Sequence, residues 1–155
     1  MIAALICLIM GSDQLVKYLI RSNFQEGETL PVIQDVFHIT YVRNWGAAFS
    51  MFQNQPLVTI LIPVVFMVLC AAFLVYGKKK GFDRMEMTAV AMIFAGGTSN
   101  LIDRTVIGYV TDMFDFRVFP VFNVADISVT VGCALLFVYV LFFEGKRGKG
   151  GKKDE

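Results

Sequence analysis

Long apolar runs separated by short polar segments dominate the chain. The clearest run, residues 57–76, has no charged residue in twenty positions. A helix of that length covers about 30 Å, the thickness of the hydrocarbon core of a bilayer. A second run, residues 124–143, is also twenty long and carries one charge, Asp126, near its start. Both runs therefore predict helices that span a membrane.

Two less uniform runs predict two more spans. Residues 87–102 are apolar with a Gly-Gly pair near the end, and small residues let a neighbouring helix approach closely in lipid. Residues 1–20 begin apolar and then include Asp13 and Lys17, which share a helical face because they are four positions apart. A cleaved signal peptide is the alternative for residues 1–20, but they lack a basic start and a small-residue cleavage site. We expect four transmembrane helices.

The distribution of basic residues predicts the orientation of these helices. Nine of the fourteen Lys and Arg lie in residues 78–84 and 146–153, and cytoplasmic segments carry the excess of basic residues. Four spans then leave both termini in the cytoplasm and expose residues 21–56 and 103–123 on the outer side. We expect the Gly- and Lys-rich end, residues 144–155, to be a flexible basic cytoplasmic tail.

The composition supports a membrane location and limits the possible chemistry. The chain is 155 residues long, with 56% hydrophobic and 17% charged residues, so we expect one integral-membrane domain, residues 1–143, ahead of the tail. A net charge of +1 argues against a nucleic-acid partner. One histidine cannot build a multi-histidine metal site, and the three cysteines, inside apolar runs, are predicted to be buried packing residues. Carboxylates must carry any acid–base chemistry.

The first outer segment predicts a small sheet and an interfacial element. Residues 31–43 alternate β-branched or aromatic residues with polar ones after a proline, as short strands do. Residues 44–52 mix small and aromatic residues, a composition suited to the headgroup zone of a membrane. We therefore expect a floor or lid at the interface beside the sheet.

Two polar clusters lie near the outer ends of the first and third predicted spans. Asp13 lies about 18 Å along its helix, in the outer half of the bilayer, one turn from Lys17. An ionisable residue there is a candidate for function, but a structural ion pair that braces the outer segments is the preferred interpretation over direct catalysis. Asn100 and Asp103 share a helical face, and Asp103 is followed by Arg104. A helix end that meets water, or a simple Asp–Arg ion pair, is the alternative for this cluster.

Two further acids can meet at the outer end of the last span. Asn123 and Asp126 have the spacing of an N-cap with a capping box. Asp112 lies in the outer segment before them, which must fold back over the ends of two helices. Two close carboxylates share one proton, so that one activates water while the other hydrogen-bonds a scissile carbonyl, with no metal or cofactor. A solvated turn, an ion pair or a proton path remains an alternative for these acids.

Five segments resemble the lipoprotein signal peptidases of bacteria, signal peptidase II, in order and spacing. They are 13–17 (DQLVK), 44–50 (NWGAAFS), 96–104 (GGTSNLIDR), 110–116 (VTDMFDF) and 119–126 (FPVFNVAD). The resemblance departs from the family at Thr98 and Ser99, where family members more often have a larger apolar residue and glycine.

The resemblance implies a fold, an activity and a set of site residues. The fold is an all-α membrane protein with four transmembrane helices, a small extracytoplasmic β-cradle and an interfacial helix. The activity is that of an aspartyl endopeptidase with Asp112 and Asp126 as the catalytic pair. The residues implied to line or support the site are Asn100, Asp103, Arg104, Asn123, Asn44, Asp13 and Lys17.

The resemblance also implies a substrate and a place in the cell. The substrate is a prolipoprotein whose cysteine already carries diacylglycerol, cut on the amino side of that cysteine. The protein is expected to be a monomer in the bacterial cytoplasmic (inner) membrane, surrounded by lipid, with its site near the outer surface. A small carrier or channel is the rival interpretation, but its charges should lie near the midplane. A non-catalytic scaffold would need no acids between the last two helices.

Overall fold

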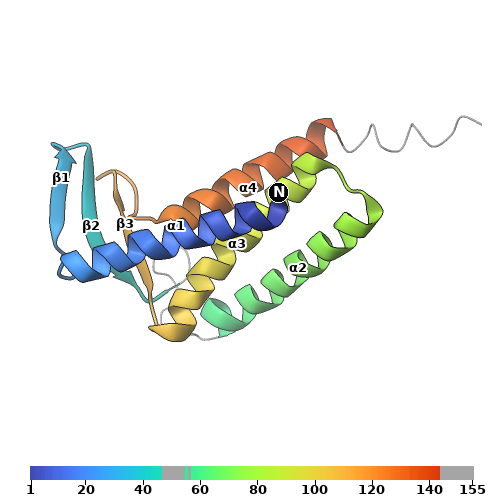
Figure 1. Cartoon of the computed structure of the whole chain (residues 1–155). Helices are drawn as coiled ribbons and strands as arrows, with labels where there is room; N and C mark the ends of the chain where they lie inside the picture. Colours follow the sequence, from blue (N-terminus) through green and yellow to red (C-terminus); the bar gives the residue numbers. More distant parts are fainter. Residues whose placement is uncertain (47–54, 56, 144–155) are drawn as a thin grey trace, which may run out of the picture.

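Four long helices and a three-stranded sheet make up the described part of the chain, residues 1–46, 55 and 57–143 of the computed structural model (Figure 1). The helices are α1 (Ile2–Asn23), α2 (Ile62–Lys80), α3 (Arg84–Val106) and α4 (Val124–Phe142), and a π-helical turn, Leu57–Leu61, leads into α2. The strands are β1 (Thr29–Ile33), β2 (Phe37–Asn44) and β3 (Val110–Asp115). The predicted tail, and the predicted interfacial element beyond residue 46, lie outside the described residues.

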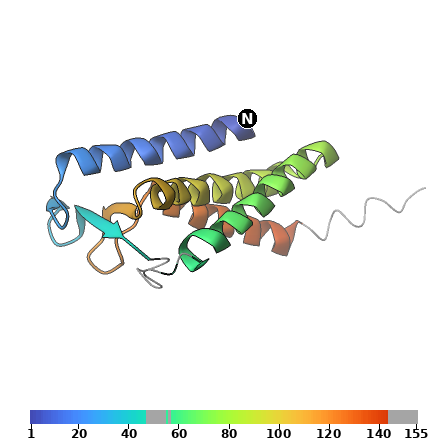
Figure 2. The ribbon, with the colours of Figure 1, turned by 90° about the horizontal axis from the view of Figure 1, so that it is seen from below.

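Helix α3 packs against each of the other three helices (Figures 1 and 2). Its closest approach to α4 depends on two glycines. A Cβ on Gly96 would collide with the backbone oxygen of Ala125, and a Cβ on Gly132 would lie 2.8 Å from the backbone oxygen of Ala89. Small residues at a helix crossing let backbones touch in lipid. Gly96, the first residue of the predicted Gly-Gly pair, therefore permits the close approach of α4.

Three of the described helical segments are long and apolar enough to cross a membrane, namely Ile2–Asn23, Leu57–Lys80 and Val124–Phe142. These correspond to three of the four predicted spans. The remaining one corresponds to α3, which is 23 residues long but more polar. Many of its residues are buried against the other helices, including Ser99, Asn100 and Asp103. A fourth span therefore stays a prediction.

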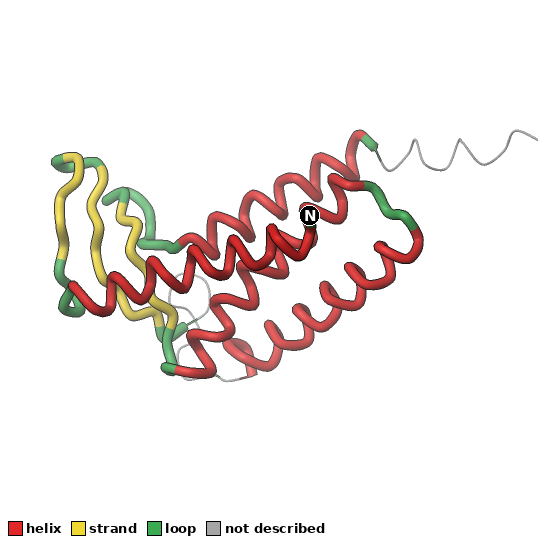
Figure 3. The backbone as a smooth tube through the Cα atoms, viewed as in Figure 1, coloured by secondary structure: helices red, strands yellow, loops and turns green. Residues whose placement is uncertain are grey.

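The sheet lies at one end of the helical bundle (Figure 3) and is antiparallel in the order β1-β2-β3. The alternating pattern at residues 31–43 forms a hairpin, as expected for strands. The third strand lies within residues 103–123, which were predicted to fold back over two helix ends but not to form a strand. Its register places Val42 opposite Asp112 across β2 and β3. The sheet is held to α1 by a cluster of buried residues formed by Ile20, Tyr41 and Met113.

The cysteine prediction is correct for one residue and wrong for two. Cys70 is buried, but Cys7 and Cys133 are exposed, and all three are free thiols. The error has a simple cause, since an apolar run in a membrane protein does not distinguish a face that packs on protein from one that contacts lipid.

Replacing Gly96 by Ala is expected to lower both stability and activity. The added methyl group meets backbone at Ala125, so α3 and α4 must separate at the turn that carries Asp126. Overpacking of this kind costs about 1–3 kcal/mol. Gly11→Ala is the matched control, because nothing lies within 4 Å of a Cβ there. Melting of both variants in detergent checks this, and a Gly96→Ala protein as stable as Gly11→Ala would contradict the close crossing.

Candidate active site

A cavity of about 370 Å³ lies where α3, α4, the strands and the start of α2 meet. Its polar lining residues are Asn44, Asn100, Arg104, Asp112, Asp126 and Thr130. Its apolar lining includes Pro63, Gly97, Val110, Phe119, Phe122 and Val129. Five of the nine predicted site residues therefore line this one cavity, including both members of the predicted pair.

Asp112 is held in β3 by two amide groups. Asn123 donates its Nδ2 hydrogen to Oδ1 of Asp112 at 2.6 Å, and Asn44 donates to Oδ2 at 3.1 Å. The side chain is almost fully buried. Burial, reinforced by the negative charge of Asp126, raises the pKa of Asp112 to about 7, although both amide hydrogen bonds oppose the shift. Asp112 therefore has an appreciable protonated fraction at neutral pH.

Asp126 is held in the first turn of α4 by a capping box, as the spacing predicted. Its backbone N–H donates to Oδ1 of Asn123 at 2.9 Å, and its Oδ2 accepts the backbone N–H of Asn123 at 3.2 Å. Its Oδ1 accepts from Nδ2 of Asn100 at 2.8 Å. Asn123 thus contacts both acids, Asp112 with its side chain and Asp126 with its backbone.

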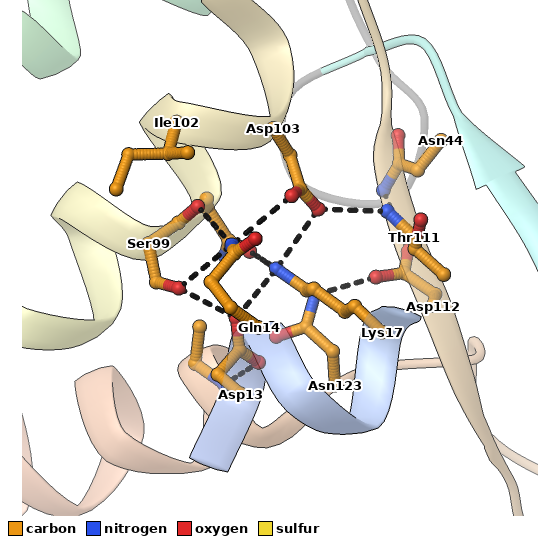
Figure 4. Close-up of polar contacts among 12 residues, drawn as sticks. Asp13, Gln14, Lys17, Asn44, Ser99, Ile102, Asp103, Thr111, Asp112 and Asn123 are labelled. Atoms are coloured by element: carbon orange, nitrogen blue, oxygen red, sulfur yellow. Dashed lines mark hydrogen bonds and ion pairs between the residues drawn. The ribbon is translucent and has the colours of Figure 1, made fainter. Parts of the chain in front are cut away.

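A buried ion cluster of Asp13, Lys17 and Asp103 lies beside Asp112 and Asn123 (Figure 4). Nζ of Lys17 lies 2.7 Å from Oδ2 of Asp13, 3.1 Å from Oδ2 of Asp103 and 2.8 Å from Oδ1 of Asn100. Lys17 and Asp13 have no exposed surface. Because Asn100 accepts from Lys17 and donates to Asp126, one amide connects the cation to the carboxylate.

The same cluster joins α1 to the elements that carry the two acids. Oδ1 of Asp13 accepts the backbone N–H of Ala125 at 2.8 Å, next to Asp126. Oδ2 of Asp103 accepts the backbone N–H of Thr111 at 3.2 Å, next to Asp112. Asp13 and Asp103 therefore fix the backbones on which the two acids sit.

Gln14 and Ser99 belong to this cluster but were not among the predicted site residues. Nε2 of Gln14 lies 3.0 Å from Oγ of Ser99 and 3.1 Å from Oδ1 of Asp103. Oγ of Ser99 donates to Oδ2 of Asp13 at 2.7 Å. Helical spacing was the available signal, because Gln14 precedes Lys17 by three positions and Ser99 precedes Asp103 by four.

Arg104 lines the cavity and contacts the segment that follows β2. Its Nη2 donates to the backbone oxygen of Gly46 at 2.9 Å, and the N–H of Gly46 donates to Oδ1 of Asn44 at 3.1 Å. The ion pairs of Asp103 are instead with Lys17, and with Arg21 at 3.8 Å. The simple Asp–Arg pair considered from the sequence is therefore replaced by contacts between different helices.

Asp115, the second acid of β3, is engaged elsewhere. It accepts from Oγ1 of Thr40 at 2.8 Å and from the backbone and guanidinium of Arg117 at 2.8 and 2.9 Å. Burial raises the pKa of Asp115, but these hydrogen bonds together outweigh it and bring the pKa below its usual value. Within the described residues, no group of three or more His, Cys, Asp or Glu side chains could hold a metal ion.

This chain resembles known proteins both in sequence and in fold. The family model described as "Signal peptidase (SPase) II" matches residues 5–142. A lipoprotein signal peptidase of Clostridioides difficile is 42% identical over 144 residues, covering 92% of this chain and 95% of its own. One from Halothermothrix orenii is 41% identical over 140 residues, covering 90% and 94%. A bacterial membrane enzyme structure obtained by the in meso method at 2.3 Å resolution has a TM-score of 0.84 and 28% identity, covering 99% of this chain and 93% of that one.

Proposed function

The chain belongs to the lipoprotein signal peptidase family, the membrane proteases called signal peptidase II, and from this we propose that it is an aspartic endopeptidase. Its substrate would be a prolipoprotein that carries diacylglycerol on cysteine, cut on the amino side of that cysteine. The observation that carries the proposal is the placement of Asp112 and Asp126 in one cavity, both in contact with Asn123.

In the proposed mechanism the two carboxyl groups share one proton and hold a water between them. The ionised member takes a proton from the water as its oxygen attacks the scissile carbonyl. The protonated member hydrogen-bonds the carbonyl oxygen as negative charge develops there. Collapse of the tetrahedral intermediate breaks the C–N bond, and a proton passes to the amine of the lipidated cysteine. No metal or cofactor takes part.

The surroundings of the two acids support Asp112 as the protonated member. Its pKa is raised to about 7. Asp126 accepts hydrogen bonds at both oxygens, and the amide of Asn100 links it to the buried cation of Lys17. Hydrogen bonds to a carboxylate and a nearby positive charge favour its ionised form and oppose the effect of its burial. The pair nevertheless titrates as one unit.

The remaining predicted residues have supporting roles in this proposal. Asn44, Asn100 and Asn123 orient the two acids through the hydrogen bonds described above. Arg104, at the cavity wall, would contact the substrate backbone. The residues that hold α1 against β3, α3 and α4 are Asp13, Lys17 and Asp103.

We further propose four transmembrane helices, with α3 as the fourth. Helix α3 has neighbours on several sides, so less of its surface must be apolar than for a helix exposed to lipid. The basic residues at the end of α2, at the start of α3 and after residue 143 would then put both termini in the cytoplasm and the cavity near the outer surface of the bacterial cytoplasmic membrane. There it meets a substrate whose acyl chains remain in the bilayer. The enzyme would act as a monomer, with residues 1–143 as its single integral-membrane domain.

Cleavage of a synthetic diacylglyceryl lipopeptide by the purified protein tests the proposed function. We expect a peptide with a new carboxyl terminus and a product whose lipidated cysteine has a free amine, formed in the presence of EDTA. The same peptide without the diacylglyceryl group is the control and should be cut poorly. Absence of cleavage of the lipidated peptide by a folded protein would contradict the proposal.

The raised pKa of Asp112 predicts a pH dependence of stability. The folded protein binds the Asp112 proton more tightly than the unfolded chain, whose aspartate has a pKa near 4. The stabilisation this proton provides is therefore complete below about pH 4 and is lost as the pH rises through about 7. Melting temperatures of the wild type and Asp112→Asn should differ in slope between pH 5 and pH 8. Parallel curves would show that Asp112 is not the group responsible.

A further inference from the structure

Two apolar tips project from one end of the sheet. The hairpin tip consists of Val32 and Ile33 at the end of β1 and Val36 in the turn that leads to β2. The loop tip lies between β3 and α4 and consists of Phe116, Val118 and Phe119. Val118 is 94% exposed, and the other five side chains are roughly half exposed. Both tips lie at the same end of the sheet (Figures 1 and 3), and the rings of Phe37 and Phe116 join them at 4.8 Å.

Local structure holds the loop tip outward. Arg117 has a φ of 63°, a left-handed conformation that few non-glycine residues adopt. Asp115 fixes this turn by accepting from the backbone and the guanidinium of Arg117. The ring of Phe116 stacks parallel to that of Phe122 at 5.9 Å. The loop is thus built to present Val118 away from the protein instead of folding it inward.

The hairpin tip has a similar construction. Asp35, at its centre, has a φ of 57°, and among the described residues Asp35 and Arg117 are the non-glycine residues with positive φ. Aspartate adopts this left-handed conformation more readily than most residues do, so Asp35 forms a tight turn that leaves the neighbouring apolar side chains exposed. Exposed apolar clusters of this kind mark sites of contact with a partner or a membrane.

The loop tip is continuous with a membrane-facing surface. Helix α4 is long and apolar enough to cross a membrane, and its exposed Ile127 and Val131 continue this surface inward. The loop tip ends five positions before Val124, the first residue of α4, so a membrane-spanning α4 would bring the loop tip close to the headgroups. Arg117 precedes Val118 in the chain, and its side chain is 48% exposed while its guanidinium binds Asp115. A cation beside apolar side chains suits the zone of lipid phosphates.

We propose that the hairpin tip and the loop tip insert into the headgroup zone of the adjacent membrane leaflet, with Arg117 directed to lipid phosphates. The sheet is then held against the bilayer at two points besides the helices. Phe119 also lines the cavity, so insertion sets the depth of the cavity relative to the lipid surface. This consequence for catalysis rests on the proposed function, whereas the insertion does not.

The depth of a nitroxide at Val118 tests the insertion. The full chain with Cys7, Cys70 and Cys133 replaced by Ala receives Val118→Cys, is spin-labelled and is placed in phosphatidylethanolamine–phosphatidylglycerol bilayers. We expect the label to lose accessibility to an aqueous nickel chelate while it stays accessible to oxygen. Glu26→Cys is the control, since Glu26 is 51% exposed and charged, and its label should stay accessible to nickel. Equal nickel accessibility at both positions would overturn the proposal.

A second measurement distinguishes lipid from substrate as the occupant. The double variant Val118→Ser with Ile33→Ser changes no residue that lines the cavity. In bilayers we expect a higher KM for the lipopeptide with unchanged kcat, and in detergent micelles no change in either constant. A KM that rises equally in both settings, or a Val118 label that becomes protected only when lipopeptide is added, would assign the tips to substrate binding. The nickel accessibility of the Val118 label without lipopeptide tests the insertion even if the protein proves to have no peptidase activity.

Discussion

Asp112→Asn and Asp126→Asn are each expected to lower kcat for a diacylglyceryl lipopeptide by about 10²–10⁴-fold, the range for general acid–base groups. An amide can neither accept the proton of the attacking water nor supply one to the carbonyl oxygen. Either change leaves a single acid in the cavity, so the shared proton is lost. Both side chains nearly match the originals in shape, and the protein should still fold.

Asp115→Asn is the matched control for these two variants. Asp115 lies in the same strand as Asp112 and is also buried, but it bonds Thr40 and Arg117 and is not among the residues that line the cavity. We expect this variant to keep turnover. Initial rates and melting temperatures of all three proteins check the prediction. Full turnover by a folded Asp112→Asn or Asp126→Asn protein would remove that residue from the catalytic pair.

Lys17→Met is expected to have the largest effect on stability. Nζ of Lys17 contacts two buried carboxylates, Asp13 and Asp103, and the amide of Asn100. Methionine fills a similar volume but leaves those carboxylates without their cation. Removing one partner of a buried ion pair costs about 3–5 kcal/mol. Since Asp13 and Asp103 also bond the backbones beside Asp126 and Asp112, activity should fall as well.

Lys78→Met is the control for this effect, because Lys78 is exposed at the end of α2. We expect it to melt like the wild type, while Lys17→Met melts far lower or fails to purify as a folded protein. Adding Asp13→Asn to Lys17→Met should recover part of the lost stability, since it removes one of the unpaired charges. A Lys17→Met protein as stable as Lys78→Met would show that the cluster is not needed for folding.

The sequence predicted the helices well because charge-free runs are an unambiguous signal. Three of the observed helices extend a few residues beyond the apolar runs, as with α3, which begins at Arg84 and ends at Val106, whereas α4 ends at Phe142. Helix ends depend on capping residues such as Asp83, which accepts the backbone N–H of Met85. The pattern of apolar residues does not identify such caps. Polar residues inside the bundle likewise made α3 the least certain span.

The placement of Asp112 and Asp126 in one cavity could be anticipated, but not the structure that brings them there. Chain length required the outer segment to fold back, whereas its pairing as β3 with β2 depends on a register set across 68 residues between Asn44 and Asp112. The buried links from Gln14 and Ser99 were missed for a related reason. Helical spacing places Gln14 on the face of Lys17 and Ser99 on the face of Asp103, but their hydrogen-bond partners lie on another helix, which spacing within one segment does not identify.

The pH dependence of kcat/KM for the lipopeptide tests most directly whether two acids share one proton. The protein described here should give a bell-shaped profile, with an alkaline limb near the pKa of about 7 of Asp112 and an acid limb where the ionised partner gains a proton. Both limbs of the profile arise from the two acids titrating together, so neither limb should remain in a variant that lacks one of the acids. A flat profile, or a rate that keeps rising through pH 9, would contradict catalysis by a carboxyl pair with a shared proton.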